Sequence, residues 1–188
     1  SFTDTAPHFA IYARNEAEAI LNTMGLDGAQ MVSREGLQIY TTLDLDVQRQ
    51  LECVARSHVT RLAGGAPNTS VNTSLGTPCV AADQFLQTLP DDVFATNRTV
   101  TNAAGIVLNS RTGEITAMLG SVNFWDEGID GNFNASIALR QPASTFKPFV
   151  YVTGFLNPID ANTVITPATM TYDVRTEFDN GTGVPYVP

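Results

Sequence analysis

The sequence has few basic side chains, and only one of its 188 residues is a lysine, Lys147. Ten Lys and Arg residues stand against 19 Asp and Glu residues, so the formal net charge is −9 at pH 7. A chain this acidic has no basic stripe to neutralise phosphates, which disfavours nucleic-acid binding and direct binding to anionic membranes. The sequence also has no apolar run of about 18 residues and no signal-peptide pattern at Ser1. We expect a piece of a longer protein, because the chain opens without Met and stops at Pro188 without a closing pattern.

Cysteine and histidine are equally scarce. Cys53 and Cys79 are the only cysteines, and their spacing fits neither a zinc site nor a CxxC redox pair. Two interpretations remain open: two buried thiols, or one disulfide that closes a Gly/Pro/Asn-rich loop in an oxidising compartment. His8 and His58 each fall in a predicted helix without a second type of ligand nearby. We therefore predict neither a metal nor a cofactor.

The first half of the chain predicts two helices and a strand. Apolar residues recur at helical spacing over residues 7–24, with a proline at the start and a glycine just after the end. Residues 37–43 (LQIYTTL) are rich in β-formers and predict a strand. Asp44 offers an N-cap for a second helix over residues 45–62, whose apolar residues lie on one side. Residues 63–77 are rich in Gly, Pro, Asn, Ser and Thr, which predicts a loop.

The second half contains a clear hairpin signal. A weak helical pattern covers residues 81–89 and ends at Pro90. Within residues 103–120, two runs of β-formers flank a turn in which Gly113 can take a positive φ. A polar loop at residues 123–136 contains Phe124 and Trp125, for which packing over the hairpin is favoured over a substrate-facing role. A helix is expected from near Ser144, and a strand is possible at residues 170–174.

The start of that last helix carries the pattern with chemical meaning. Ser144 and Lys147 form an S-x-x-K motif, and residues three apart share a helix face, so the amine can reach the hydroxyl. A serine hydroxyl becomes a good nucleophile only when a neighbour takes its proton, which an amine can do and a guanidinium cannot. A helix start also directs its dipole and free N–H groups at a developing oxyanion. The spacing alone is weak evidence, but the only lysine of the chain lies here.

The surrounding residues strongly resemble the active-site segment of class A, bifunctional penicillin-binding proteins. Residues 140–151 (RQPASTFKPFVY) are nearly identical to the family run RQPGSTFKPFVY, with Ala143 in place of the usual glycine. Residues 36–44 (GLQIYTTLD) are similar to the linker before the transpeptidase domain, and residues 104–118 (AGIVLNSRTGEITAM) resemble its first hairpin. Residues 6–9 and 133–135 also match family segments, so the resemblance covers most of the chain.

This resemblance implies an α+β chain, part of the penicillin-binding and β-lactamase-like transpeptidase fold preceded by a mixed helix and strand linker. Residues 1–100 would be the linker region, and residues 101–188 the N-terminal part of the transpeptidase domain. Ser144 would be the nucleophile and Lys147 the proton acceptor. Peptidoglycan stem peptides or their lipid-linked precursor would be the substrate, and β-lactam antibiotics would be ligands. The enzyme would act at the extracytoplasmic face of the bacterial membrane, held by an upstream anchor outside this chain.

The family's later motifs are missing downstream of Ser144. The resemblance requires an S-x-N and a K-[ST]-G element after the S-x-x-K segment, and residues 149–188 contain neither. Similar triplets at residues 70–72, 111–113 and 121–123 lie upstream, in the wrong order, and receive no catalytic role. We therefore expect the isolated chain to be inactive. Two alternatives stay open: a D,D-carboxypeptidase or β-lactamase in which water is the acceptor, and a non-catalytic wall-binding scaffold of the same fold.

Overall fold

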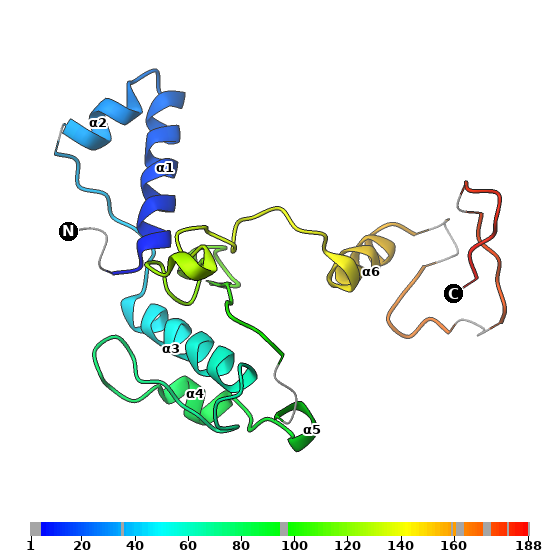
Figure 1. Ribbon diagram of the computed structural model, residues 1–188. Helices are drawn as coiled ribbons and strands as arrows, with labels where there is room; N and C mark the ends of the chain where they lie inside the picture. Colours follow the sequence, from blue (N-terminus) through cyan, green and yellow to red (C-terminus); the bar gives the residue numbers. More distant parts are fainter. Residues whose placement is uncertain are drawn as a thin grey trace. The chain divides into compact units, whose positions relative to one another are not determined.

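The computed structural model describes residues 5–34, 36–94, 98–158, 160, 164–170, 174–179 and 181–187. The chain divides into two compact units, residues 1–138 and residues 139–188, each of which is described by itself. Figure 1 labels the α-helices. In chain order the elements are α1 (Pro7–Thr23), α2 (Gly28–Arg34), α3 (Leu45–Leu62), α4 (Val80–Phe85), α5 (Asp91–Phe94), the strands β1 (Gly105–Leu108) and β2 (Ile115–Leu119), the 3₁₀ turns η1 (Glu127–Ile129) and η2 (Ala143–Phe146), and α6 (Lys147–Leu156). This mixture of helices with one small sheet is consistent with part of an α+β fold. The predicted domain boundary at residue 100 stays a prediction.

Helix α3 confirms the prediction for residues 45–62 at both ends. The Asp44 carboxylate accepts hydrogen bonds from the backbone N–H groups of Asp46 and Val47, at 2.9 and 3.1 Å. These bonds satisfy two of the donors that a helix start leaves without an intrahelical acceptor. Helix α1 likewise confirms the prediction for residues 7–24 to within one residue, with Pro7 in its first turn.

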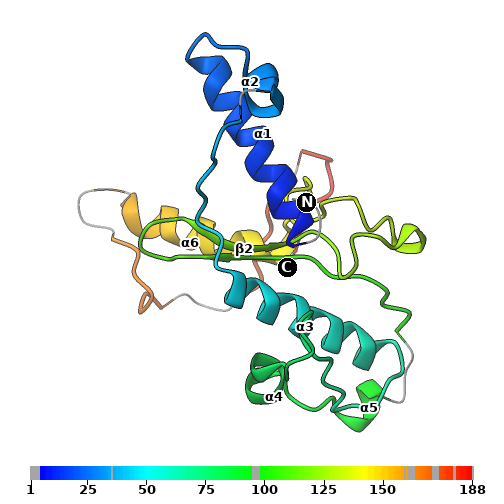
Figure 2. The ribbon, with the colours of Figure 1, turned by 90° about the vertical axis from the view of Figure 1, so that its left-hand side faces the viewer.

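The predicted hairpin is present as an antiparallel pair of strands, β1 and β2. Gly113 adopts a φ of +78°, which a residue with a side chain rarely takes, and its N–H donates to the Asn109 carbonyl oxygen at 2.8 Å. The register shifts between Val107 and Leu108. Figure 2 shows the hairpin between α1 and α3, both of which contact β2.

The prediction of a strand at residues 37–43 is wrong. This segment is extended but joins no sheet ladder. Only its end meets the hairpin: the Thr42 hydroxyl donates to the Ile115 carbonyl oxygen at 2.6 Å, and the Asp44 N–H donates to the Thr116 carbonyl oxygen at 2.9 Å. The segment has the composition of a strand, but a ladder requires a partner strand, and residues 37–43 have none within the described part of the chain. The possible strand at residues 170–174 lies mostly outside the described residues.

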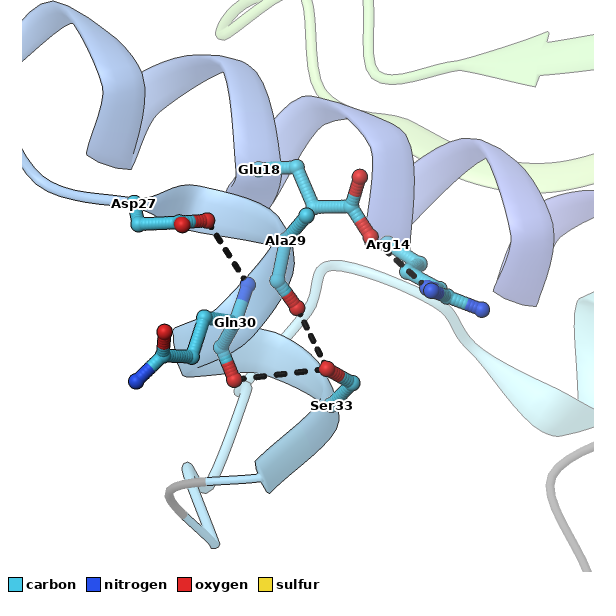
Figure 3. Close-up of polar contacts among 6 residues, drawn as sticks. All are labelled: Arg14, Glu18, Asp27, Ala29, Gln30 and Ser33. Atoms are coloured by element: carbon cyan, nitrogen blue, oxygen red, sulfur yellow. Dashed lines mark hydrogen bonds and ion pairs between the residues drawn. The ribbon is translucent and has the colours of Figure 1, made fainter.

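Helix α2 was not predicted from the sequence. It folds back against α1, and Figure 3 shows polar contacts within α1 and within the segment of α2. The Asp27 carboxylate accepts from the Gln30 N–H at 2.9 Å, and the Ser33 hydroxyl donates to the Ala29 carbonyl oxygen at 2.5 Å. An acidic residue three positions before a glutamine is the sequence signal that could have revealed this helix start.

The predicted loop at residues 63–77 is present and continues to Cys79, and side chains of α3 hold it at several points. Arg61 is buried and donates from Nε to the Thr69 carbonyl oxygen at 2.7 Å. The Ser57 hydroxyl accepts from the Val71 N–H at 2.8 Å. Cys53 and Cys79 form a disulfide, and both are fully buried. The question left open by the sequence is thus settled in favour of the disulfide. The predicted helix at 81–89 is shorter, as α4, and α5 follows it.

Gln48 joins α3 to the hairpin from a buried position. Its side-chain amide donates to the Met118 carbonyl oxygen at 3.1 Å, and its side-chain oxygen accepts from the Met118 N–H at 2.8 Å. Met118 itself packs in a small core with Ala6 and Phe9. Because both backbone groups of Met118 bond to this one side chain, Gln48 occupies the place that a third strand would take beside β2.

His8 fixes the start of α1 against the loop that follows β2. Its ring is only 4% exposed, and Nε2 donates to the Gly131 carbonyl oxygen at 3.0 Å. Phe124 meets the imidazole edge to face, with ring centroids 5.0 Å apart. Gly120 is required here, because a Cβ at that position would lie 2.5 Å from the His8 ring. The histidine is thus a structural residue of unit 1, in keeping with its predicted place in a helix.

We predict that His8 makes unit 1 less stable in acid. Burial lowers the pKa of His8 below 6.5, and hydrogen bonds to the Gly131 and Phe133 backbones only partly offset this. The unfolded chain therefore binds the proton more readily, so stability falls as the pH drops below about 6.5. Urea denaturation, followed by Trp125 fluorescence, should give a lower free energy of unfolding at pH 5.0 than at pH 7.5. His8→Gln should reduce this difference, and an unchanged difference would contradict the assignment.

Unit 2 contains η2, α6 and an isolated antiparallel bridge between Phe178 and Tyr186. Helix α6 is apolar over most of its surface, yet large side chains along it, among them Phe149 and Leu156, are exposed within the described residues. A helix that is apolar on all sides is normally buried in a larger protein. Among the parts of the chain that the structure describes, no helix is both long and apolar enough to cross a membrane.

Candidate active site

Ser144 and Lys147 lie at the start of the last helical segment, as predicted. Ser144 is in the 3₁₀ turn η2, and Lys147 is the first residue of α6. The Lys147 N–H donates to the Ser144 carbonyl oxygen, which is the i to i+3 bond of a 3₁₀ turn. Side chains three residues apart are eclipsed in such a turn, so the backbone places the hydroxyl and the amine on the same face.

The side chains of this pair are both exposed. Among the described residues, the structure contains no hydrogen bond between the Ser144 hydroxyl and the Lys147 amine. Activation of an amine as a base needs desolvation or a nearby positive charge, and the described residues of unit 2 place no burying surface over Lys147. The pair thus has the backbone arrangement of a nucleophile and its proton acceptor, without an enclosing pocket.

The entry into this helix is tightly turned. The Thr145 N–H donates to the Pro142 carbonyl oxygen at 3.0 Å, and the Thr145 hydroxyl donates to the same oxygen. Ala143 adopts a φ of +45°, in the left-handed region that glycine occupies with least strain. Ala143 is also the residue that replaces the usual glycine of the family run. Its positive φ is a conformation that glycine, without a side chain, adopts with less strain.

We expect Ala143→Gly to stabilise this turn by about 1 kcal/mol, because it removes the strain of a side chain in the left-handed region. Hydrogen exchange of the Lys147 amide, which is bonded to Ser144, should slow by about fivefold. The same substitution at Ala10, inside α1, should instead destabilise that helix by about 1 kcal/mol. Faster exchange of the Lys147 amide in Ala143→Gly would contradict this interpretation of the turn.

Trp125 is not packed over the hairpin, contrary to the expectation for the loop at 123–136. Its indole is 64% exposed and touches Phe124 edge to face, with ring centroids 4.8 Å apart. Phe124 fills the space between this indole and His8 instead. The loop therefore uses one aromatic ring for packing and presents the other to solvent.

The comparisons with known proteins identify the class of this segment. The family model "Penicillin binding protein transpeptidase domain" matches residues 103–183, which include β1, β2, η2 and α6. Over these residues the chain is similar to the transpeptidase domain of the penicillin-binding proteins, which supports the resemblance found in the sequence.

Individual relatives agree with the family match. Over 64 residues the chain is 38% identical to Penicillin-binding protein 1A of Neisseria gonorrhoeae and of Neisseria meningitidis, and 39% identical to that of Neisseria lactamica. Each match covers 34% of this chain and 8% of the relative. No solved structure matches the chain significantly.

Proposed function

We propose that Ser144 is the acyl nucleophile of a peptidoglycan D,D-transpeptidase and that Lys147 accepts its proton. The observation that carries the proposal is the placement of the RQPASTFKPFVY segment. Its serine lies in the turn that begins the helical segment, and the only lysine of the chain lies one turn further on. The segment falls within the residues that match the transpeptidase family.

The reaction would proceed by two acyl transfers. The Ser144 oxygen attacks the carbonyl carbon between the two terminal D-alanines of a stem peptide, while its proton passes to the Lys147 amine. The C–N bond then breaks, the terminal D-alanine leaves with a proton, and the remaining peptide is held on Ser144 as an ester. An amine from a second stem peptide attacks this ester and restores the serine. The backbone N–H of Ser144 lies in the first helical turn, where N–H groups lack intrahelical acceptors and can stabilise the oxyanion.

The same serine would react with β-lactams, since these present an amide carbonyl in a strained ring to the nucleophile. The disulfide between Cys53 and Cys79 supports the location proposed for this chemistry. Disulfides persist in oxidising compartments, so it favours the extracytoplasmic face of a bacterial membrane over the cytosol. An anchor outside residues 1–188 would hold the enzyme there.

Labelling with a fluorescent penicillin tests the proposal. By the family resemblance, acylation also needs an S-x-N and a K-[ST]-G element, and residues 149–188 contain neither. We therefore expect residues 1–188 alone to show no rapid labelling, because Ser144 and Lys147 remain exposed to water. A longer form of the protein that carries both elements should label to one adduct per chain. Rapid stoichiometric labelling of residues 1–188, or no labelling of the longer form, would overturn the proposal.

A further inference from the structure

A pocket of about 280 Å³ opens in unit 1 and includes neither Ser144 nor Lys147. One wall is the face of α3 that carries Gln48, Arg49, Glu52 and Arg56. The turn at residues 74–75 and the loop at residues 121–125 form the other walls, and the start of α1 closes one end. The pocket therefore lies where the disulfide-bound loop, the hairpin and two helices meet.

Arg56 brings a positive charge to this pocket. Its Nη2 donates to the Asn72 carbonyl oxygen at 3.1 Å, which holds the guanidinium in place. Its Nε is buried without an acceptor, and the described residues form no ion pair with it. A buried donor without a partner is costly, and on a cation it favours an anionic acceptor from outside the chain. A carboxylate suits a guanidinium best, because the two groups can bond in parallel.

The other polar side chains that α3 contributes to the pocket have partners, and Glu52 can accept a further hydrogen bond. Arg49 is paired with Asp46 at 2.9 Å, so its charge is balanced. The Gln48 side-chain amide hydrogen-bonds through both its nitrogen and its oxygen to the backbone of Met118. Its nitrogen also donates to the Glu52 carboxylate at 2.8 Å. A carboxylate accepts several hydrogen bonds, so Glu52 keeps the capacity to accept an N–H from a ligand.

Two exposed apolar side chains complete the pocket. Trp125 is 64% exposed and is held edge-on by Phe124, and Leu75 is 66% exposed. Both line the pocket from opposite loops. Ligand pockets typically combine such apolar walls with a few polar groups that fix orientation. The Trp125 indole offers a rigid face against which an apolar group can pack without losing much conformational freedom.

We propose that this pocket binds the carboxylate end of a short peptide. The ligand's carboxylate pairs with Arg56, a peptide N–H donates to Glu52, and its apolar side packs against Trp125 and Leu75. The assignment stands independently of acyl transfer at Ser144, since no residue of that site takes part. The carboxylate could belong to a stem peptide of the cell wall or to the C-terminus of a protein, and the two differ in the chirality of their residues.

Tryptophan fluorescence tests this directly, because Trp125 is the only tryptophan of the chain. Residues 1–188 are titrated with N-acetyl-D-alanyl-D-alanine and with the same peptide as its C-terminal amide. We expect a saturable change with the acid and at least about tenfold weaker binding of the amide, because only the acid pairs with Arg56. A third titration uses N-acetyl-L-alanyl-L-alanine. Tighter binding of the D,D peptide than of the L,L peptide identifies the ligand as a wall peptide, and equal binding identifies it as any peptide with a free carboxylate. Equal binding of acid and amide, or no saturable change, would overturn the proposal.

Two arginine variants separate the pocket from the net charge of the chain. Arg56→Gln should weaken binding of the acid by at least about tenfold, whereas Arg111→Gln, on the exposed hairpin turn, should change it by less than about twofold. Leu75→Ala provides a third variant, at an exposed side chain. It should weaken the binding of the acid and of the amide equally, because it removes only an apolar contact. Circular dichroism checks that Arg56→Gln keeps its helices. Equal losses in Arg56→Gln and Arg111→Gln would refute a specific site.

Discussion

Ser144→Ala is expected to abolish the penicillin adduct in a form of the protein that carries the S-x-N and K-[ST]-G elements. In the proposed mechanism the adduct is an ester on the Ser144 oxygen, and alanine offers no oxygen to acylate. Loss of a nucleophile typically lowers such rates by orders of magnitude, so we expect at least about a thousandfold slower labelling. Gel fluorescence after timed exposure to a fluorescent penicillin measures the rate.

Matched variants assign this effect to the nucleophile. Ser110→Ala removes an exposed hydroxyl from the hairpin turn and should label at the rate of the unchanged protein. Lys147→Arg keeps the positive charge and the helix start but replaces an amine with a guanidinium, which stays protonated. It should therefore slow labelling by at least about a hundredfold. Persistence of the adduct in Ser144→Ala would remove Ser144 from the mechanism, and normal labelling of Lys147→Arg would remove the amine as proton acceptor.

The features that the sequence predicted well are those that depend on neighbouring residues. Asp44 caps α3 through a residue three positions away, and the N–H of Gly113 closes the hairpin turn on a residue four positions away. The RQPASTFKPFVY run likewise predicts a helical segment that starts near Ser144, and the catalytic roles of Ser144 and Lys147 stay a prediction. In each case the determining contacts lie within one turn of helix or one β-turn, so a local pattern carries the information.

The features that the sequence did not predict depend on contacts between distant residues. Residues 37–43 have the composition of a strand, but pairing needs a free strand edge, and Gln48 bonds both backbone groups of Met118 beside β2. The pocket in unit 1 is lined by Arg56 of α3 and by Trp125 of the loop after β2. No spacing rule relates these residues, because they come together only when α3 packs against β2. The strain at Ala143 is similar, since the motif names the residue but only the backbone reveals its positive φ.

The disulfide should have the largest effect on stability of any single feature of unit 1. It joins residues 26 positions apart, Cys53 in α3 and Cys79 just before α4, and so restricts the unfolded chain strongly. The chain-entropy estimate for a loop of this length is about 3 kcal/mol. We therefore expect the double variant Cys53→Ala/Cys79→Ala to lose about 3 kcal/mol in free energy of unfolding, measured by urea denaturation under oxidising conditions.

Two further comparisons decide whether the loss comes from the covalent link. Unfolding of the unchanged protein in the presence of a reductant should approach that of the double variant, while the double variant should not respond to reductant. Arg61 and Ser57 still bind the loop at Thr69 and Val71, so the loop should loosen mainly at its Cys79 end. Because Leu75 lies in that end and lines the pocket, peptide binding should weaken along with stability. Equal stability of the two proteins under oxidising conditions would show that packing around Cys53, rather than the disulfide, holds the loop to α3.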